Sequence, residues 1–402
     1  MCMNYNKKTI RDVDVSGKKV LLRADFNVPH DKKTGVIQDD TRIVATLPTI
    51  RYLLEHGAAV IVCSHLGRPH GVWKKELSLA SAGERLSKLL GMPVPLTEDV
   101  LGADTKAKAA ELQPGQMMLI ENLRFRLEEE KNDPAFSQEL ASLADLFVFD
   151  AFGAAHRAHS STAGVADYIP AFAGFLVEKE LEIMGGALKN PKRPLVAILG
   201  GSKVSDKIGV INNLLELADA ILIGGGMAYT FQVASGGTVG QSLLESDKLD
   251  FARQMLVKAK EKGVQFLLPV DNLAAETFSA DATPVEVDSR SIPEHLIGMD
   301  IGPKTVAAFT QAMQGAGTVI WNGPMGVFEF PAYAGGTKAV AKAVSELPGA
   351  VTIVGGGDSA SAVEQLGFAD AITHISTGGG AALEFLEGLT LPGIACLADR
   401  ES

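Results

Sequence analysis

The sequence has few cysteines and no long apolar run, and each shortage excludes a class of protein. Cys2, Cys63 and Cys396 are far apart and form no CxxC pair, which excludes a disulfide scaffold and a cysteine-based metal cluster and suits a reducing compartment. No run approaches the roughly 18 apolar residues that a membrane helix needs. The polar N-terminus, MCMNYNKKTIRDVDV, lacks the apolar core of a secretory signal. We therefore expect a soluble, cytoplasmic protein.

Positive charge is also in the minority. There are 37 Lys and Arg against 48 Asp and Glu, a formal net charge of −11. This total argues against broad binding to nucleic acid or to anionic membranes, although a local group of cations can still bind an anion. The chain has 402 residues, of which 46% are hydrophobic, and 42 are glycines. That length exceeds one ordinary core, so we expect two domains of a globular α/β protein.

Short apolar runs alternate with longer amphipathic segments, which predicts parallel sheets covered by helices on both faces. The predicted strands are Lys19–Arg23, Ala59–Cys63, Met117–Ile120, Leu146–Phe149, Leu195–Leu199, Ala220–Ile223, Gln265–Leu268, Thr318–Trp321, Val351–Val354 and Ile372–Ile375. The predicted helices are Thr41–Glu55, Leu77–Leu90, Phe175–Leu188, Ser205–Leu217, Lys248–Lys262 and Thr337–Glu346. The two halves of the chain therefore follow the same plan.

The halves meet where DYIPAFAG, at residues 167–174, supplies a proline and a glycine before a helical pattern. We predict a first lobe over residues 1–172, a hinge helix over 173–189 and a second lobe over 190–387. Ligands of open parallel sheets bind beyond the carboxyl ends of the strands. The polar motifs of this sequence fall at those ends.

Arginines follow three predicted strand ends of the first half, at Arg68, Arg124 and Arg157. Arg42 stands at a helix start, where the helix dipole disfavours a cation, and a bound anion would explain its position. Guanidinium groups pair bidentately with phosphate and carboxylate. Each arginine alone could be structural, but four together favour an anion pocket.

Asp25 and Asn27 follow the first strand, where they could bind substrate hydroxyls or simply form an Asx turn before Pro29. The pattern leaves both interpretations open.

The second half is rich in glycine turns at strand ends. GGSKVSDK places Lys203 and Lys207 at a helix start, where backbone N–H groups and a lysine suit a phosphate. It is not a Walker A loop, because GxxxxGK[ST] is absent. GGGMAY, WNGPMGVFE, VGGGDS and STGGGA repeat the pattern. Asp358 and Ser359 could cap a helix, or bind magnesium and phosphate.

Two other functions fit parts of this pattern. Gly355-x-Gly357-x-x-Ala360 matches a loose dinucleotide fingerprint, so a nicotinamide-dependent oxidoreductase is one alternative. It is disfavoured because the next strand end, HISTGGG, lacks the expected acid. A non-catalytic nucleotide-binding regulator is the other. It is disfavoured because the charged residues that phosphoryl transfer requires are all present.

Eight motifs occur in one order along nearly the whole chain: RADFNVP, SHLGRP, LIENLRF, FGAAHRAHS, GGSKVSDK, WNGPMGVFE, GGGDS and STGGGA. Together they resemble the phosphoglycerate kinase family. The resemblance implies an α/β fold of two Rossmann-like, doubly wound parallel-sheet lobes joined by a helical hinge, with residues 388–402 returning to the first lobe. It implies a monomeric glycolytic phosphotransferase that moves a phosphoryl group reversibly between 1,3-bisphosphoglycerate and Mg-ADP, giving 3-phosphoglycerate and ATP by direct in-line transfer on domain closure.

The resemblance also implies site residues. Those for the 3-phosphoglycerate site are Asp25, Phe26, Asn27, Arg42, His65, Leu66, Gly67, Arg68, Arg124 and Arg157. Those for the nucleotide are Lys207, Gly225, Gly298, Asn322, Glu329, Gly356, Gly357, Asp358 and Ser359. Arg42, Lys203 and Lys207 are the implied catalytic residues, and Asp358 is the implied Mg²⁺ ligand, together with the nucleotide phosphates.

The sequence departs from the family's motifs at three positions: Ala154 replaces threonine, Ser202 alanine and Ser359 threonine. Ala154 lacks a hydroxyl that could support Arg157, whereas Ser359 keeps its hydroxyl. The residues offer no obvious pair of nucleophile and base. Direct transfer between ionised acceptors needs none, because positioning and charge neutralisation carry the catalysis.

Overall fold

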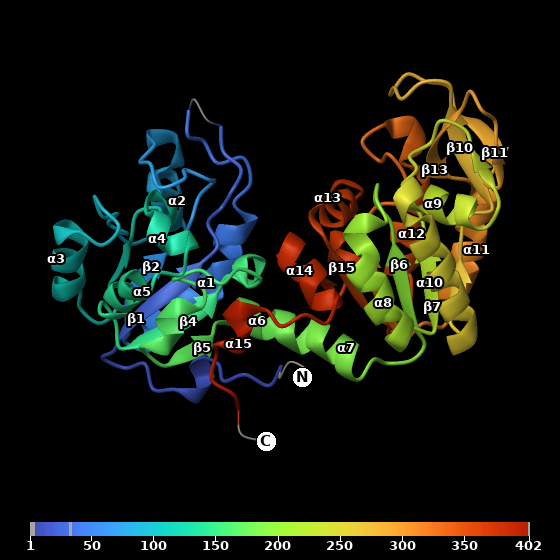
Figure 1. The fold of residues 1–402 in the computed structure, drawn as a ribbon. Helices are drawn as coiled ribbons and strands as arrows, with labels where there is room; N and C mark the ends of the chain where they lie inside the picture. The colour runs from blue at the N-terminus through green and yellow to red at the C-terminus, as the bar shows by residue number, and fades with distance from the viewer. Residues whose placement is uncertain (1–4, 32–33, 401–402) are drawn as a thin grey trace. The chain divides into compact units, whose positions relative to one another are not determined.

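The computed structural model describes residues 5–31 and 34–400, so Cys2 lies outside the described residues. The chain forms two compact units (Figure 1). The first comprises the chain up to Glu182 together with the segment from Thr390 onward, and the second comprises Ile183–Leu389. Within the described ranges, no helix is long and apolar enough to cross a membrane.

The first unit is built on a parallel five-stranded sheet. Its strands are β1 (Lys19–Ala24), β2 (Ala59–Cys63), β3 (Met117–Leu119), β4 (Leu146–Asp150) and β5 (Ala171–Ala173), in the order β3-β2-β1-β4-β5. Every residue of β2, β3, β4 and β5 is buried. Burial on both faces explains why these strands read as continuous apolar runs.

The helices of this unit include α1 (Thr41–Glu55), α2 (Ala80–Leu90), α3 (Ala103–Glu111), α4 (Leu127–Glu130) and α5 (Pro134–Ala141). Helix α1 packs Ile43, Ile50 and Leu53 into the same core as Val20 and Leu22 of β1. The helix predicted from Leu77 starts three residues later, because Leu77 ends a separate 3₁₀ turn.

The second unit contains a parallel six-stranded sheet. Its strands are β6 (Leu195–Leu199), β7 (Ala220–Ile223), β9 (Gln265–Leu267), β14 (Thr318–Asn322), β15 (Val351–Gly355) and β16 (His374–Ile375), in the order β16-β15-β14-β6-β7-β9. Trp321 of β14 is fully buried in its core. The helices are α8 (Ile208–Leu217), α9 (Met227–Ala234), α10 (Leu249–Lys262), α11 (Pro303–Met313), α12 (Gly335–Ser345), α13 (Gly357–Gln365) and α14 (Gly379–Leu386). Both units therefore have the predicted α/β, parallel-sheet architecture.

The second unit also carries two small sheets that the sequence pattern does not indicate. An antiparallel sheet joins β10 (Asp271–Ala275) to β11 (Val285–Asp288) and β13 (Ile297–Ile301). A further pair joins β8 (Thr238–Val239) to β12 (Ser291–Ile292). These strands are short and partly exposed, so their residues lack the continuous apolar pattern of the main sheet.

The predicted hinge segment is a helix interrupted near its middle. It consists of α6 (Phe175–Glu180), a π-helical turn over Leu181–Gly185 and α7 (Gly186–Lys189). The division between the two units falls inside the π-helical turn. At the beginning of α6, the Asp150 carboxylate at the end of β4 accepts the N–H groups of Leu176 and Val177.

The segment after Thr390 packs in the first unit. Its helix α15 (Pro392–Ala395) places the N–H of Gly393 2.9 Å from the Ala155 carbonyl oxygen. The buried Lys7 ammonium donates to the Leu397 carbonyl at 3.0 Å and to the Asp399 carboxylate at 2.7 Å. Lys7, near the beginning of the described chain, thus binds residues near its end.

Candidate active site

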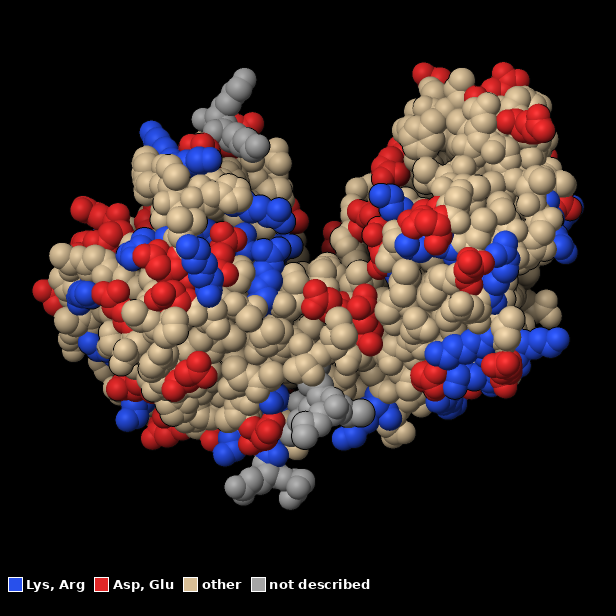
Figure 2. Space-filling view, in the orientation of Figure 1, with Lys and Arg blue, Asp and Glu red and all other residues tan. Residues whose placement is uncertain are grey.

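The first set of candidate residues lies at the carboxyl ends of four neighbouring strands. Asp25, Phe26 and Asn27 follow β1, and His65, Leu66, Gly67 and Arg68 follow β2, while Arg124 follows β3 and Arg157 follows β4. Because these parallel strands are adjacent, their ends bring the residues to one edge of the sheet. Lys and Arg side chains also gather on the surface of this unit in Figure 2.

Arg42 is anchored to the loop after β1. Its Nη1 lies 3.2 Å from Asp25 Oδ2 and 3.0 Å from the Asn27 carbonyl oxygen. The Asn27 N–H closes an Asx turn on Asp25, and Asn27 Oδ1 accepts the Gly67 N–H at 2.9 Å. The Asx-turn interpretation is therefore right for Asp25, and Arg42 has an acidic partner that accounts for its position without an anion.

Arg124 is almost completely buried, and two nitrogens of its guanidinium group have partners. Its Nη1 donates to the Gly67 carbonyl at 2.8 Å, and its Nε lies 3.4 Å from Glu130 Oε1. Burial lowers the pKa of Arg124 to about 10, against the raising influence of Glu130. Asn122, which sequence reasoning did not single out, accepts the Arg124 N–H and donates to the Leu66 carbonyl. It fixes the loop of β3 against that of β2.

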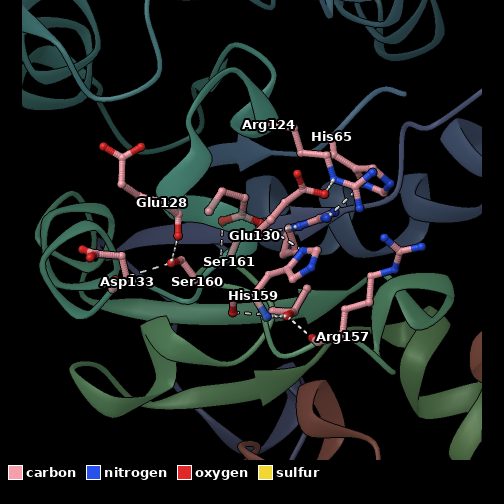
Figure 3. A network of polar contacts seen from close by, with 12 residues as sticks. His65, Arg124, Glu128, Glu130, Asp133, Arg157, His159, Ser160 and Ser161 are labelled. Carbon is pink, nitrogen blue, oxygen red and sulfur yellow. Dashed lines mark hydrogen bonds and ion pairs between the residues drawn. The ribbon is translucent and has the colours of Figure 1, made fainter. Parts of the chain in front are cut away.

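His65 is buried among cations, with its Nδ1 3.0 Å from Arg23 Nη2. Burial and the charges of Arg23, Arg124, Arg157 and Arg42 hold the pKa of His65 well below its usual value. The ring is therefore neutral at physiological pH. In Figure 3, His65, Arg124 and Arg157 lie on one side of the cluster, whereas Glu128 and Asp133 lie on the other.

Arg157 is half-buried on the loop after β4, and Arg68 is exposed. The Arg157 carbonyl accepts the Thr162 hydroxyl at 2.5 Å, and its N–H donates to the Ala154 carbonyl at 3.1 Å. The loop thus keeps support through its backbone despite the missing hydroxyl at Ala154.

The second set of residues borders a cavity of about 330 Å³ in the second unit. The cavity lies at the ends of β6, β14 and β15 and is lined by Gly200, Gly201, Ser202, Lys203, Asp206, Lys207, Asn322, Gly323, Pro324, Gly356, Gly357, Asp358, Ser359, Gly379, Gly380 and Leu383. Seven of the predicted residues therefore share one site. Glycines dominate the wall, so the backbone can approach a bound group closely.

Lys207 and Asn322 face one another in this cavity. The Lys207 ammonium donates to Asn322 Oδ1, and burial lowers the pKa of Lys207 to about 8 although Asp206 and Asp358 raise it. Asn322 Nδ2 is buried and finds no acceptor among the described residues. An unpaired buried donor is costly, and a bound phosphate oxygen would satisfy it.

Asp358 and Ser359 occupy the first turn of α13, but the side chains do not cap the helix. Ser359 Oγ instead accepts the Gly323 N–H at 2.6 Å and donates to the Gly355 carbonyl at 3.0 Å. It ties the loop of β14 to that of β15. The capping interpretation of these two residues is therefore wrong, and the first N–H groups of α13 receive no side-chain cap.

Three predicted nucleotide residues lie outside this cavity lining. Gly225 has φ +66°, and a Cβ there would stand 2.6 Å from the Gly201 carbonyl oxygen. Gly298 lies in β13, where its N–H donates to Ser242 Oγ at 2.8 Å. Glu329 is exposed on a turn after β14. Gly225 therefore lets its loop approach the loop that contains Gly201. Gly298 and Glu329 do not line the cavity.

Comparison with known proteins connects these features. The family model described as phosphoglycerate kinase matches residues 10–389. Proteins named phosphoglycerate kinase from Clostridium novyi (strain NT) and Clostridium tetani (strain Massachusetts / E88) are 58% and 57% identical to this chain. The alignments cover 99% of this chain and 100% of the first protein, and 98% of this chain and 99% of the second.

Solved structures agree. The structure of phosphoglycerate kinase from Coxiella burnetii superposes with a TM-score of 0.90 at 44% identity, and that from Pyrococcus horikoshii OT3 with 0.80 at 35%. Each comparison covers 97% of this chain and 98% of the other.

Proposed function

The chain belongs to the phosphoglycerate kinase family, and from that premise we propose that it transfers a phosphoryl group reversibly between 1,3-bisphosphoglycerate and Mg-ADP, giving 3-phosphoglycerate and ATP. One structural observation carries the residue-level proposal. A glycine-walled cavity in the second unit holds Lys203, Lys207 and an unsatisfied Asn322 donor, as a nucleotide phosphate requires. The buried guanidinium group of Arg124 and the cationic side chains around it form the second part of the proposal, a site for 3-phosphoglycerate in the first unit.

Each side chain has a defined task in this proposal. Arg68, Arg124 and Arg157 bind the phosphate of 3-phosphoglycerate, which is remote from the reacting carboxyl group. Arg42 and Lys203 neutralise charge on the transferring group. The acceptor oxygens are already ionised, so no base has to remove a proton, and catalysis rests on positioning and electrostatic stabilisation.

Asp358 is the proposed ligand of Mg²⁺. Among the residues the structure describes, no group of three or more His, Cys, Asp or Glu could hold a metal. A site with the single carboxylate of Asp358 still suits magnesium, because this ion usually binds one or two carboxylates together with substrate phosphates. When bound, it would neutralise phosphate charge, while Lys207 and the N–H groups of α13 orient the nucleotide.

In-line transfer further requires that the two units approach each other, and we include this closure in the proposal. Its support is chemical, because the two sets of residues belong to different units and direct transfer needs the acceptor beside the donor. The interrupted helix at the division between the units is the proposed hinge. Small-angle scattering with and without both substrates tests closure, and unchanged dimensions would contradict it.

We further propose that the protein acts as a monomer in the cytoplasm. The net charge of −11 and the free thiols of Cys63 and Cys396 support this proposal. Gel filtration with light scattering checks the monomer.

A coupled assay for ATP-dependent formation of 1,3-bisphosphoglycerate tests the activity. We expect turnover that depends on 3-phosphoglycerate, ATP and Mg²⁺ together. Absence of turnover in a folded protein that still binds nucleotide would favour the regulator. Protein-dependent reduction of a nicotinamide cofactor by an added oxidisable substrate would favour the oxidoreductase.

A further inference from the structure

Three buried polar residues stand behind His65 without belonging to the site described above. Arg23, Ser161 and Glu129 are 1%, 0% and 0% exposed. Arg23 lies in the otherwise apolar strand β1, Glu129 in α4 and Ser161 on the loop after β4. Burying a charge costs free energy unless the charge is paired and hydrogen-bonded. The hydrogen bonds of these residues therefore indicate their role.

The contacts form a continuous chain that ends at the His65 ring. Ser161 donates to Glu129 twice, from its N–H at 3.0 Å to Oε2 and from its hydroxyl at 2.6 Å to Oε1. The Ser161 hydroxyl oxygen accepts Arg23 Nε at 2.8 Å. Arg23 Nη2 then lies 3.0 Å from His65 Nδ1. Figure 3 shows Ser161 near the middle of the cluster, between Glu128 and Asp133 on one side and His65 and Arg157 on the other.

From this geometry we propose that Glu129, Ser161 and Arg23 act as positioning residues that fix His65 as the neutral tautomer with its proton on Nε2. The proposal rests on the proposed function, because it assigns His65 the task of donating that Nε2–H to an oxygen of the bound three-carbon acid.

The tautomer of His65 follows from the number of donors on arginine. A guanidinium group has five N–H donors, no acceptor, and stays protonated in proteins. The Arg23 Nη2–H must therefore point at a lone pair on Nδ1, which leaves that nitrogen unprotonated. The neutral ring then carries its single proton on Nε2. The described residues give Nε2 no hydrogen bond, so it remains available to a ligand.

Ser161 matters because it fixes the orientation of the guanidinium plane. The Ser161 hydroxyl has one proton, which goes to Glu129, so its oxygen is left to accept from Arg23 Nε. Arg23 Nη1 meanwhile donates to the carbonyl of Ala24. With Nε and Nη1 both engaged, Nη2 is held toward His65. Glu129, Ser161 and Arg23 thus form a relay of hydrogen bonds that orients His65, because the hydrogen bond at one ring nitrogen decides which nitrogen carries the proton.

The surrounding charges support the same state of the ring. Arg23, Arg124, Arg157 and Arg42 all oppose a positive charge on His65. Glu129 is the acid at the far end of this chain of contacts, where its Oε1 also lies 3.9 Å from His159 Nδ1, and it reaches His65 through Ser161 and Arg23. A cationic ring would add a fifth positive charge, whereas the neutral tautomer donates a hydrogen bond without that cost.

Nitrogen NMR tests the tautomer directly and needs no catalysis. Protein labelled with ¹⁵N-histidine gives correlations that distinguish the two tautomers and the imidazolium form of each of the eight histidines, and His65→Gln identifies the signals of His65. We expect an unprotonated Nδ1 and a protonated Nε2 throughout pH 5.5 to 8. A protonated Nδ1, or titration near the ordinary value of about 6.5, would overturn the proposal.

Ser161→Ala tests the relay, and Ser160→Ala is its matched control. Ser160 is equally buried, but within the described part of the chain its hydroxyl contacts the backbone carbonyls of Glu128 and Asp133 and no side chain. We expect Ser161→Ala to raise the KM for 3-phosphoglycerate about tenfold, since a hydrogen bond to a charged group is lost. The KM for ATP should stay unchanged, and the His65 spectrum should show a second tautomer.

Two outcomes would contradict the relay: a wild-type His65 spectrum in Ser161→Ala, or equal changes of KM in the two serine variants. If Ser161→Ala does not fold, Glu129→Gln replaces it, because the amide NH₂ cannot accept from Ser161 while the side chain keeps its size. A protein without kinase activity but with the Nε2–H tautomer would overturn the proposed function and leave the arrangement of the relay standing.

Discussion

Arg42 and Asp25 form an ion pair at 3.2 Å, and both belong to the candidate 3-phosphoglycerate site. The Arg42 side chain is about one-third exposed, whereas that of Asp25 is mostly buried. The guanidinium group therefore has donors left for a ligand while Asp25 holds it in place. An arginine oriented in this way loses less freedom when it binds an anion than a solvated one does.

Replacing Arg42 by alanine should depress kcat by at least about 100-fold, the range seen when one preorganised donor to a transition-state charge is removed. Steady-state kinetics of the coupled assay measure this. Arg126→Ala is the control, because Arg126 is a comparably exposed arginine of the same unit that pairs with Glu128 at 2.7 Å. Near-normal turnover of Arg42→Ala would remove Arg42 from the catalytic set.

The lowered pKa of Lys207 predicts a pH dependence of nucleotide binding. Burial brings that pKa to about 8, so the ammonium group loses its proton as the pH rises through about 8, and its attraction for phosphate is lost with it. We expect the KM for ATP to rise above that pH. Lys207→Arg should remove the inflection, since arginine stays charged, whereas Lys258→Arg on the surface of α10 should keep the wild-type profile. An unchanged inflection in Lys207→Arg would assign it to another group.

A pair of glycine variants separates backbone strain from a collision at the nucleotide site. Gly225 and Gly263 have nearly the same φ, +66° and +69°. A Cβ at Gly225 would stand 2.6 Å from the Gly201 carbonyl oxygen, whereas one at Gly263 meets nothing within 4 Å. Gly263→Ala should cost about 1–2 kcal/mol of unfolding free energy and leave the kinetics unchanged.

Gly225→Ala should cost more than Gly263→Ala and should raise the KM for ATP, because Gly201 lines the cavity. Urea unfolding and steady-state kinetics give both quantities. Equal losses of stability with an unchanged KM would show that the contact between the two loops is not needed.

Asp150 predicts a pH dependence of stability. Its carboxyl group is fully buried, and burial raises its pKa from 3.8 to about 7 against the lowering influence of the Thr49 hydroxyl and of the Val177 and Leu176 N–H groups. The folded state thus binds this proton more tightly than the unfolded one. The resulting stabilisation is complete below about pH 4 and is lost as the pH rises through about 7.

Asp150→Asn mimics the protonated form and keeps an oxygen for the N–H groups at the beginning of α6. Relative to wild type, the variant should therefore be more stable at pH 8 than at pH 5, as measured by urea unfolding. Asp145→Asn, at an exposed carboxyl group just before β4, should change stability equally at both values. The same difference at pH 5 and pH 8 for Asp150→Asn would refute the prediction.

The sequence predicted the parallel sheets well because their strands are buried on both faces. Runs such as Ala59–Cys63 and Leu195–Leu199 consist of apolar residues that no exposed strand would carry. The antiparallel strands could not be found in this way, since Val285–Asp288 is mostly exposed and polar. The interruption of the predicted hinge helix could not be read from the sequence, because Leu181–Gly185 keeps a helical pattern of apolar residues.

The candidate site also contains residues that the sequence indicates and residues that it does not. Charged residues after strand ends were apparent from their position alone, and Lys207 and Asp358 indeed share a cavity. Glu129 and Ser161 were missed because contacts between residues 32 positions apart leave no local pattern. Arg23 did carry a signal, since a charge inside the strand KVLLR requires a buried partner. Which partner it has depends on the packing of three separate elements.

The return of the chain to its first unit has a consequence for synthesis on the ribosome. Domains generally fold in the order in which they emerge, but here the first unit lacks the segment from Thr390 onward until late in translation. Lys7 then still lacks Leu397 and Asp399, while Ile183–Leu389 has been synthesised. The last residues of the second unit are therefore synthesised before the last residues of the first.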